Sequence, residues 1–193
     1  TYTLNPSDPD FVNLHGGGKG TETFTYTLTD ADGDTSTANL VLNISNLDDP
    51  VNFGGVGANG GVITVFEKNL AAGSSPDAAA LTQSGSFTVS AADGLQSLSV
   101  GGINLVSGGV ANTSAQSVVT PLGNTFTVTG YDPATGVVTY SYTLLGNEGH
   151  PAGGGANSLG ESFAVVATDT DGSTNSINPV SYTHLRAHET PEH

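Results

Sequence analysis

Three aspartates occupy alternating positions in the segment Thr29-Asp-Ala-Asp-Gly-Asp-Thr35. Carboxylates this close repel one another unless a cation joins them. Ca²⁺ suits such a group because it takes about 6 to 8 oxygen ligands in flexible geometry, backbone carbonyls and water included. The loop is not an EF-hand, since Val41 stands where an EF-hand has its last glutamate. The motif predicts a Ca²⁺ site at Asp30, Asp32 and Asp34, with a metal-free acidic hairpin turn as the alternative.

Two further acidic groups are candidate metal ligands. The segment Asp169-Thr-Asp-Gly-Ser173 repeats the motif with Ser173 in place of the third carboxylate, so we expect a weaker site at Asp169 and Asp171. Asp48 and Asp49 precede Pro50, and Glu67 ends the next strand-like run. These three residues either share a Ca²⁺ that stiffens a joint, or Asp48-Asp49-Pro50 is an ordinary solvated linker.

The elements that carry these groups occur twice. Glu22 to Asp34 aligns with Glu161 to Ser173 at a constant offset of 139, and Tyr2-Thr-Leu4 pairs with Tyr142-Thr-Leu144. A tandem repeat of about 140 residues explains the match. We therefore divide the chain into the C-terminal part of one repeat (1–47), a linker (48–50) and most of the next repeat (51–180).

Alternating apolar and polar residues predict β-strands in both parts. In the first part, Thr alternates with Phe24, Tyr26 and Leu28, and Leu40, Leu42 and Ile44 form a second run. Further strands are expected at 62–66, 86–90, 96–100, 103–106, 117–120, 125–129, 137–145 and 161–168. Short strands separated by Asp-Gly, Gly-Gly and Pro-containing turns indicate an all-β fold, an antiparallel β-sandwich in tandem repeats.

The last thirteen residues, 181–193, break this pattern. They hold three of the five histidines and the only arginine. They resemble a translated cloning scar, and we interpret them as a foreign tail that replaces the final strand of the second repeat.

Composition excludes several classes of function. The chain has 193 residues, a net charge of -15, only three Lys and Arg residues, and neither Cys nor Trp. It therefore has no basic patch for nucleic acid, no apolar run long enough to insert in a membrane, and no thiol chemistry. His15 and His150 lie beside Gly-rich loops in equivalent places and form no catalytic set with Ser and Asp, so we expect no enzyme.

Several motifs in combination resemble a known family. They are Phe24 to Asp34, Phe87 to Leu95, Val128 to Leu144 and His150 to Gly155. Together they look like the roughly 140-residue tandem repeat of giant type I-secreted bacterial adhesins of the RTX and VCBS kind, over residues 1 to about 178.

The resemblance implies an Ig-like or cadherin-like extender domain that Ca²⁺ rigidifies, outside the cell or at the bacterial surface. Its partners would be neighbouring repeats of the same chain, and the ligand of the parent adhesin is unknown. It also implies that the aspartates named above bind the metal, Asp48, Asp49 and Glu67 less surely. The alternative function is a carbohydrate- or surface-binding β-sandwich, although the absence of Trp is unfavourable for sugar stacking.

Overall fold

The computed structural model describes residues 1–5, 14, 18–45, 49–55, 63–150 and 158–185, with the backbone alone for 179–185. In these ranges the protein consists of β-strands and two short 3-10 helices, Glu67–Asn69 (η1) and Ala79–Leu81 (η2). None of the described helices has the length and apolar character needed to span a membrane. The chain divides into two compact units, the first made of Thr1–Asp49 with the short segment Asp171–Ser173 and the second of Pro50–Thr170 with Thr174–His193.

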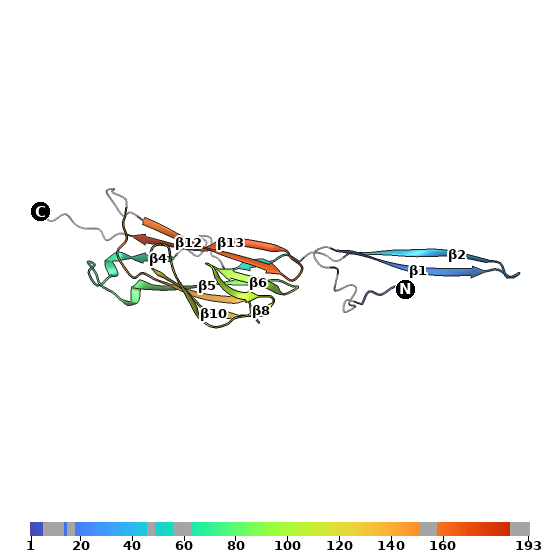
Figure 1. The fold of residues 1–193 in the computed structure, drawn as a ribbon, viewed down its shortest axis with the longest axis horizontal. Coiled ribbons are helices and arrows are strands. Elements are labelled where there is room, and N and C mark those ends of the chain that lie inside the picture. The colour runs from blue at the N-terminus through green and yellow to red at the C-terminus, as the bar shows by residue number, and fades with distance from the viewer. Residues whose placement is uncertain (6–13, 15–17, 46–48, 56–62, 151–157, 186–193) are drawn as a thin grey trace. The chain divides into compact units, whose positions relative to one another are not determined.

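The first unit is built around a long antiparallel hairpin (Figure 1). Strands β1 (Lys19–Thr29) and β2 (Thr35–Ser45) pair along their whole length, from Lys19 opposite Ser45 to Thr29 opposite Thr35. Because side chains alternate across a strand, the threonines of β1 lie on one face of the hairpin and its apolar residues on the other. The two predicted strands are confirmed, and both are longer than the apolar alternation alone indicated.

The second unit is a β-sandwich of two sheets (Figure 1). One sheet has the order β3-β5-β11-β10-β9, with strands Asn52–Gly54, Thr82–Ser90, Val137–Thr143, Thr125–Asp132 and Gln116–Val119. The other has the order β4-β13-β12-β6-β7-β8, with strands Ile63–Phe66, Thr174–Leu185, Ser158–Asp169, Leu95–Val100, Ile103–Ser107 and Val110–Ala111. Neighbouring strands are antiparallel, except that β13 and β4 are parallel. The predicted all-β class is confirmed.

The core of the sandwich lies between the two sheets and is rich in aromatic side chains. Phe126 of β10 stacks on Phe163 of β12, with ring centroids 4.3 Å apart. Tyr140 of β11 packs against both Phe126 and Phe87. Alternation along each strand directs these residues inward, and this is why the expected strands of the second part all form near their predicted positions.

One turn and one tight contact depend on glycine. Gly136 has φ +70° and donates its N–H to the carbonyl of Asp132, which closes the turn between β10 and β11. Gly101 has φ +56°, and a Cβ there would lie 2.9 Å from the ring of Phe163. A larger residue at Gly101 would therefore both strain the backbone and push against the aromatic core.

The expectation of a missing last strand was wrong. Strand β13 continues to Leu185, five residues into the segment 181–193, and pairs with β12 and with β4. Its register with β12 shifts between Ile177 and Val180, where Pro179 has no N–H to donate. The β-branched and aromatic residues beyond Pro179 favour extended backbone, and two neighbouring strands supply hydrogen-bond partners. Strand β13 therefore lies between β4 and β12 in its sheet.

Replacement of Phe163 by alanine should lower the free energy of unfolding of the sandwich by about 3–5 kcal/mol, because removal of a buried stacked ring leaves a cavity. Phe24→Ala is the matched control, since Phe24 occupies the equivalent position in β1 and is 47% exposed. It should cost less than about 0.5 kcal/mol in the same transition. Urea unfolding followed by circular dichroism measures both, and equal losses would contradict the difference in burial.

Candidate metal centre

The turn between β1 and β2 brings three aspartates together. One carboxylate oxygen of Asp30, Oδ1, accepts hydrogen bonds from the N–H groups of Asp32, Gly33 and Asp34, at 3.3, 3.1 and 2.9 Å. The backbone N–H of Asp30 in turn donates to the carbonyl of Asp34. Gly33 adopts φ +100°, which lets the chain reverse without strain. The hydrogen bonds to the Asp30 carboxylate therefore order the backbone of the turn and also hold that carboxylate in place.

The carboxylates of Asp30, Asp32 and Asp34 offer ligand oxygens that all lie within 4.8 Å of one another. All three residues are exposed, and no other group of three or more metal-binding side chains occurs in the described ranges. Three anionic groups at this separation repel, and a bound divalent cation relieves the repulsion. Hard oxygen donors, open to water that can complete the shell, fit Ca²⁺ better than a softer metal.

The neighbouring groups perturb the first aspartate. Hydrogen bonding with the Asp32 carboxyl is the largest effect, and together with the backbone N–H groups of the turn it holds the pKa of Asp30 below its ordinary value of 3.8. Hydrogen bonds to a carboxylate stabilise its charged form. Asp30 therefore stays ionised to lower pH, the state in which it can bind a cation.

A comparison within the chain shows how an ordinary acidic turn differs. At the turn between β10 and β11, Asp132 accepts hydrogen bonds from the Ala134 N–H at 2.9 Å and from the Thr135 hydroxyl at 2.7 Å. The Thr135 hydroxyl is the main cause that lowers the pKa of Asp132. This turn holds a single carboxylate whose two oxygens both have donors, so it has no need of a metal ion.

The second copy of the motif does not reproduce the triad. Asp169 is buried at the end of β12, whereas Asp171 is half-buried and accepts a hydrogen bond from the Ser173 N–H at 3.1 Å. Between them, Thr170 donates its hydroxyl to the carbonyl of Asp93 at 2.6 Å. Because Ser173 supplies no carboxylate, this turn offers two acidic ligands rather than three.

The predicted linker site has a different outcome for each residue. Asp48 lies outside the described residues, and Asp49 is exposed. Glu67, in η1, is 2% exposed, and its Oε1 accepts the Glu148 N–H at 2.7 Å and lies 2.8 Å from Nε2 of His150. The side chain of His150 is equally buried. Within the second unit, this carboxylate therefore fastens the segment after β11 to η1.

A second buried glutamate is not evident from its sequence context. Glu161 of β12 accepts hydrogen bonds from the Tyr142 hydroxyl at 2.6 Å, the Thr120 hydroxyl at 3.0 Å and the Leu122 N–H at 3.0 Å. Burial, and then the Glu161 carboxylate, raise the pKa of Tyr142 well above its ordinary range. The signal available in the sequence was the repeat itself, because Glu22 and Tyr2 align with Glu161 and Tyr142.

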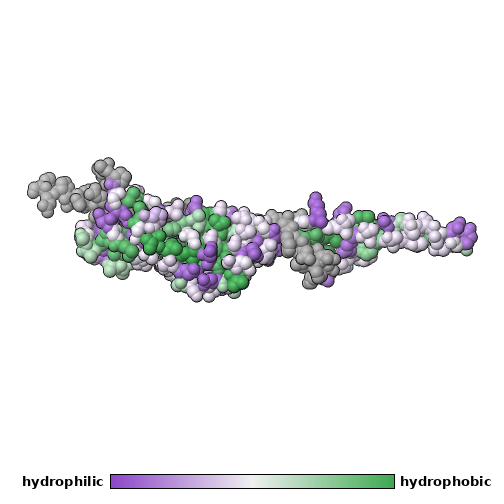
Figure 2. Space-filling model, viewed as in Figure 1, coloured by the Kyte–Doolittle hydropathy of each residue, from purple (hydrophilic) through white to green (hydrophobic). Residues whose placement is uncertain are grey.

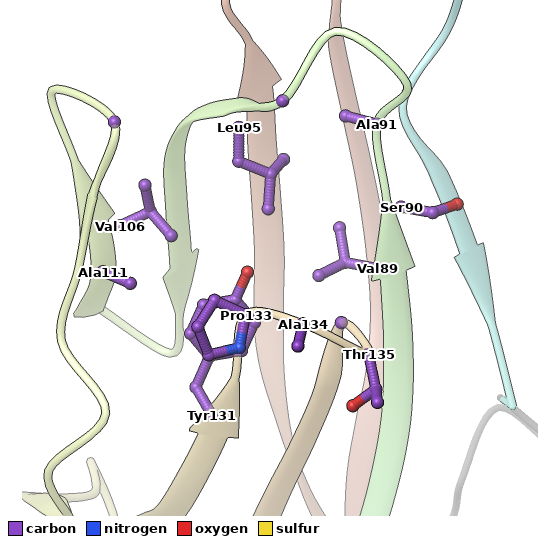
Figure 3. Close-up of a pocket in the computed structure, with 13 residues that line it drawn as sticks. Val89, Ser90, Ala91, Leu95, Val106, Ala111, Tyr131, Pro133, Ala134 and Thr135 are labelled. Carbon is purple, nitrogen blue, oxygen red and sulfur yellow. The ribbon is translucent and has the colours of Figure 1, made fainter.

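A groove of about 300 Å³ lies at one end of the sandwich, between the turn after β10 and the β5–β6 turn (Figure 3). Val89, Leu95, Val106 and Tyr131 point toward its interior. Tyr131 is only 7% exposed, and burial, followed by the neighbouring Asp132 charge, raises its pKa. The groove exposes polar and apolar surface in similar amounts, and its one aromatic lining residue, Tyr131, is too covered for a sugar to stack on it.

The Tyr142→Phe variant should lose about 1.5–3 kcal/mol of unfolding free energy, because it removes a hydrogen bond to a buried carboxylate. Tyr26→Phe is the matched control, since Tyr26 is exposed on β1, and it should change stability by less than about 0.5 kcal/mol. Both values come from urea unfolding at neutral pH. A loss below about 0.5 kcal/mol for Tyr142→Phe would show that Glu161 needs no donor from this tyrosine.

Asp30 should titrate below the ordinary value of 3.8 in metal-free buffer, as measured from side-chain carboxyl carbons by NMR. Since the folded pKa is lowered, the contribution of Asp30 to stability is complete above the unfolded value and disappears as the pH falls through the folded value. Asp32→Ala should move the pKa of Asp30 back toward 3.8, because Asp32 provides the largest effect. An unshifted Asp30 in the unmodified chain would contradict the hydrogen-bonded turn.

Comparison with known proteins gives no relative from which a role could be transferred. No family model, curated protein or solved structure matches the chain. The functional assignment must therefore be argued from the residues and contacts of this chain alone.

Proposed function

We propose that the chain is a structural spacer of a large secreted or cell-surface bacterial adhesin, built of tandem β-sandwich repeats and stiffened by Ca²⁺. The observation that carries the proposal is the group of carboxylates from Asp30, Asp32 and Asp34, with ligand oxygens within 4.8 Å of one another. Its partners are neighbouring repeats of the same chain, and its place is outside the cell. It has no catalytic role in this proposal.

The strand pairing supports the repeat relationship. Thr29 pairs with Thr35 in the first hairpin, and Thr168 pairs with Thr174 in the second, at the offset of 139 found in the sequence. The next three pairs match at the same offset, as far as Tyr26 opposite Ala38 and Val165 opposite Ile177. Both turns also have a glycine at φ +100°. Tandem copies of one sandwich account for this agreement.

A bound Ca²⁺ would supply positive charge at the turn, held by Asp32, Asp34 and the second oxygen of Asp30. The first oxygen of Asp30 already accepts three N–H groups, so the chain itself orients this ligand before any ion arrives. The ion would relieve repulsion among the three carboxylates and stabilise the reversed backbone. A hairpin end that is fixed in this way resists bending, as a spacer requires.

The net charge of -15 fits this role. Self-repulsion at this charge favours an extended chain where Ca²⁺ is scarce, as in the cytosol, and this suits export before folding. Extracellular modules bind Ca²⁺ with dissociation constants of about 10⁻⁴ to 10⁻³ M, so their sites fill only outside the cell. If Ca²⁺ binds the folded state and not the unfolded state, binding raises the stability of the folded state by mass action.

Calorimetric titration of the full chain with Ca²⁺ should reveal binding that the double change Asp30→Asn and Asp32→Asn reduces by one site. The reason is that two of the three carboxylate ligands lose their charge while the turn keeps polar side chains. Asp132→Asn is the matched control, because Asp132 lies in an acidic turn with a single carboxylate, and it should leave the stoichiometry unchanged. Thermal unfolding in EDTA and in about 1 mM Ca²⁺ measures the linked stability.

An unchanged stoichiometry in the double variant would remove the triad from the metal site. Absence of any Ca²⁺ binding by the full chain would sink the stiffened-spacer proposal as a whole. A rise in melting temperature that is reproduced by NaCl at matched ionic strength would show charge screening rather than a site.

The second candidate function is binding of a carbohydrate or surface, and the groove beside Tyr131 is the observation that favours it. Its volume of about 300 Å³ is at the low end for small-ligand sites. The proposal is weaker because the Thr135 hydroxyl is already bonded to Asp132 and Tyr131 is nearly covered. Glycan-array binding by the full chain that Tyr131→Ala abolishes and Tyr26→Ala leaves intact would favour it over the spacer.

A further inference from the structure

The first hairpin presents an apolar face to solvent. Phe24, Tyr26 and Leu28 of β1 are 47%, 59% and 70% exposed, and Leu40 opposite Phe24 is 53% exposed. Hydrophobic surface is visible on the hairpin in Figure 2, away from its hydrophilic turn end. A two-stranded sheet is at best marginally stable in water when nothing covers its apolar face. Such a patch therefore indicates a docking surface.

The second hairpin shows what this face becomes when it is covered. At the offset of 139, Phe24, Tyr26 and Leu28 correspond to Phe163, Val165 and Ala167 of β12. These three residues are 6%, 0% and 0% exposed. The register of the two hairpins is the same over this stretch, so the same face is exposed in one unit and buried in the other.

The covering sheet of the sandwich is β5-β11-β10. Phe126 of β10 stacks on Phe163, and Tyr142 of β11 lies 6.4 Å from the same ring. Tyr140 and Phe87 extend the aromatic layer across β11 and β5. The inner face of this sheet is thus an aromatic surface that fits an apolar hairpin face of this register.

One corner of this covering is already present in the first unit. The Tyr2 hydroxyl donates to Oε1 of Glu22 at 3.1 Å, and the Tyr2 ring lies 6.2 Å from that of Phe24. In the sandwich, Tyr142 makes the corresponding contacts with Glu161 and Phe163. Residues near Tyr2 therefore occupy the place of the last part of β11, and among the described residues no further strand covers the hairpin face.

We propose that the apolar face of the β1–β2 hairpin is a docking surface for a sheet with the strands and inner side chains of β5-β11-β10, supplied by a second copy of that half of the sandwich. The inference rests on the repeat relationship in the proposed function but needs neither Ca²⁺ nor an adhesive role. The occupant supplies the residues that lead into Tyr2, as Tyr140 and Ser141 lead into Tyr142, and it seats an aromatic ring on Phe24 as Phe126 does on Phe163. A dimer in which two β1–β2 hairpins pack face to face would supply no chain segment that leads into Tyr2.

The test is a chain in which a second copy of residues 50–140 is placed directly before Thr1. In this arrangement Tyr140 runs into Thr1-Tyr2, as it runs into Ser141-Tyr142 in the sandwich. Hydrogen exchange of the β1 and β2 amides should slow by at least about 100-fold relative to the unmodified chain. Calorimetry should show a second cooperative transition, and sedimentation should show a monomer. All measurements are made in EDTA and repeated with Ca²⁺.

Two matched variants locate the docking face. Phe24→Lys with Leu28→Lys should abolish the slowing of exchange in the extended chain, because charges would enter the new interface. Thr23→Lys with Thr27→Lys changes the opposite face of the same strand and should preserve it.

Three outcomes would overturn the inference. The first is unchanged exchange in the extended chain, including the case in which the added copy stays unfolded. The second is equal effects of the two lysine pairs. The third is an unmodified chain that already protects its β1 and β2 amides as a dimer, which would assign the face to hairpin-to-hairpin association. Absence of Ca²⁺ binding by the full chain would contradict the spacer proposal and leave this result intact.

Discussion

The apolar face of a β-ribbon becomes stable only when a second sheet excludes water from it. In the sandwich, β12 and β13 meet this condition because β10 and β11 place Phe126 and Tyr142 against Phe163. At about 25 cal/mol per Å² of apolar surface removed from water, this is the dominant favourable contribution to folding. The strand order, the inward alternation and the tight approach of Gly101 all serve that contact between the sheets.

The two hairpins separate the effect of local sequence from that of packing. Both reverse through a glycine at φ +100°, and both pair in the same register at the offset of 139. Local chemistry alone therefore defines the turn and the pairing. Phe163 is buried because the sheet that contains β10 and β11 covers it, whereas Phe24 is exposed. Burial of the apolar face therefore depends on packing in the whole sandwich.

Much of this architecture could be predicted from the sequence, since alternation and turn residues act over short distances. Thr125 to Thr129 and Glu161 to Thr168 both lie within observed strands, and the reversal before Gly136 was evident from its Asp-Pro and Gly residues. The Asp30 triad could be recognised for the same reason, because its ligands are neighbours along the chain.

The contact between Glu67 and His150 could not be predicted, because 83 residues separate them and no local pattern encodes such a pairing. The role of Glu161 was missed for a related reason, since its donors come from Thr120, Leu122 and Tyr142 on other segments. The extension of β13 to Leu185 depends on β4, which is distant in sequence and runs parallel to it. Each of these features follows from tertiary contacts that a single segment does not carry.

The number of hydrogen-bond donors distinguishes a structural carboxylate from a candidate metal ligand. The buried Glu161 has three protein donors, and the exposed Asp132 has a donor for each oxygen. In the triad, the backbone N–H groups all converge on Oδ1 of Asp30, and within the described ranges the carboxylate of Asp34 accepts no hydrogen bond from the protein.

A cluster that holds more negative charge than its donors can compensate must rely on water, on a shared proton or on a cation. A shared proton is lost as the pH rises above the range in which carboxyl groups titrate, and water in an exposed turn screens the repulsion only in part. Near neutral pH, a divalent cation is therefore the partner that compensates the charge most completely. Such an ion would act only at the turn, and it could not replace a sheet packed on the apolar face of the same hairpin.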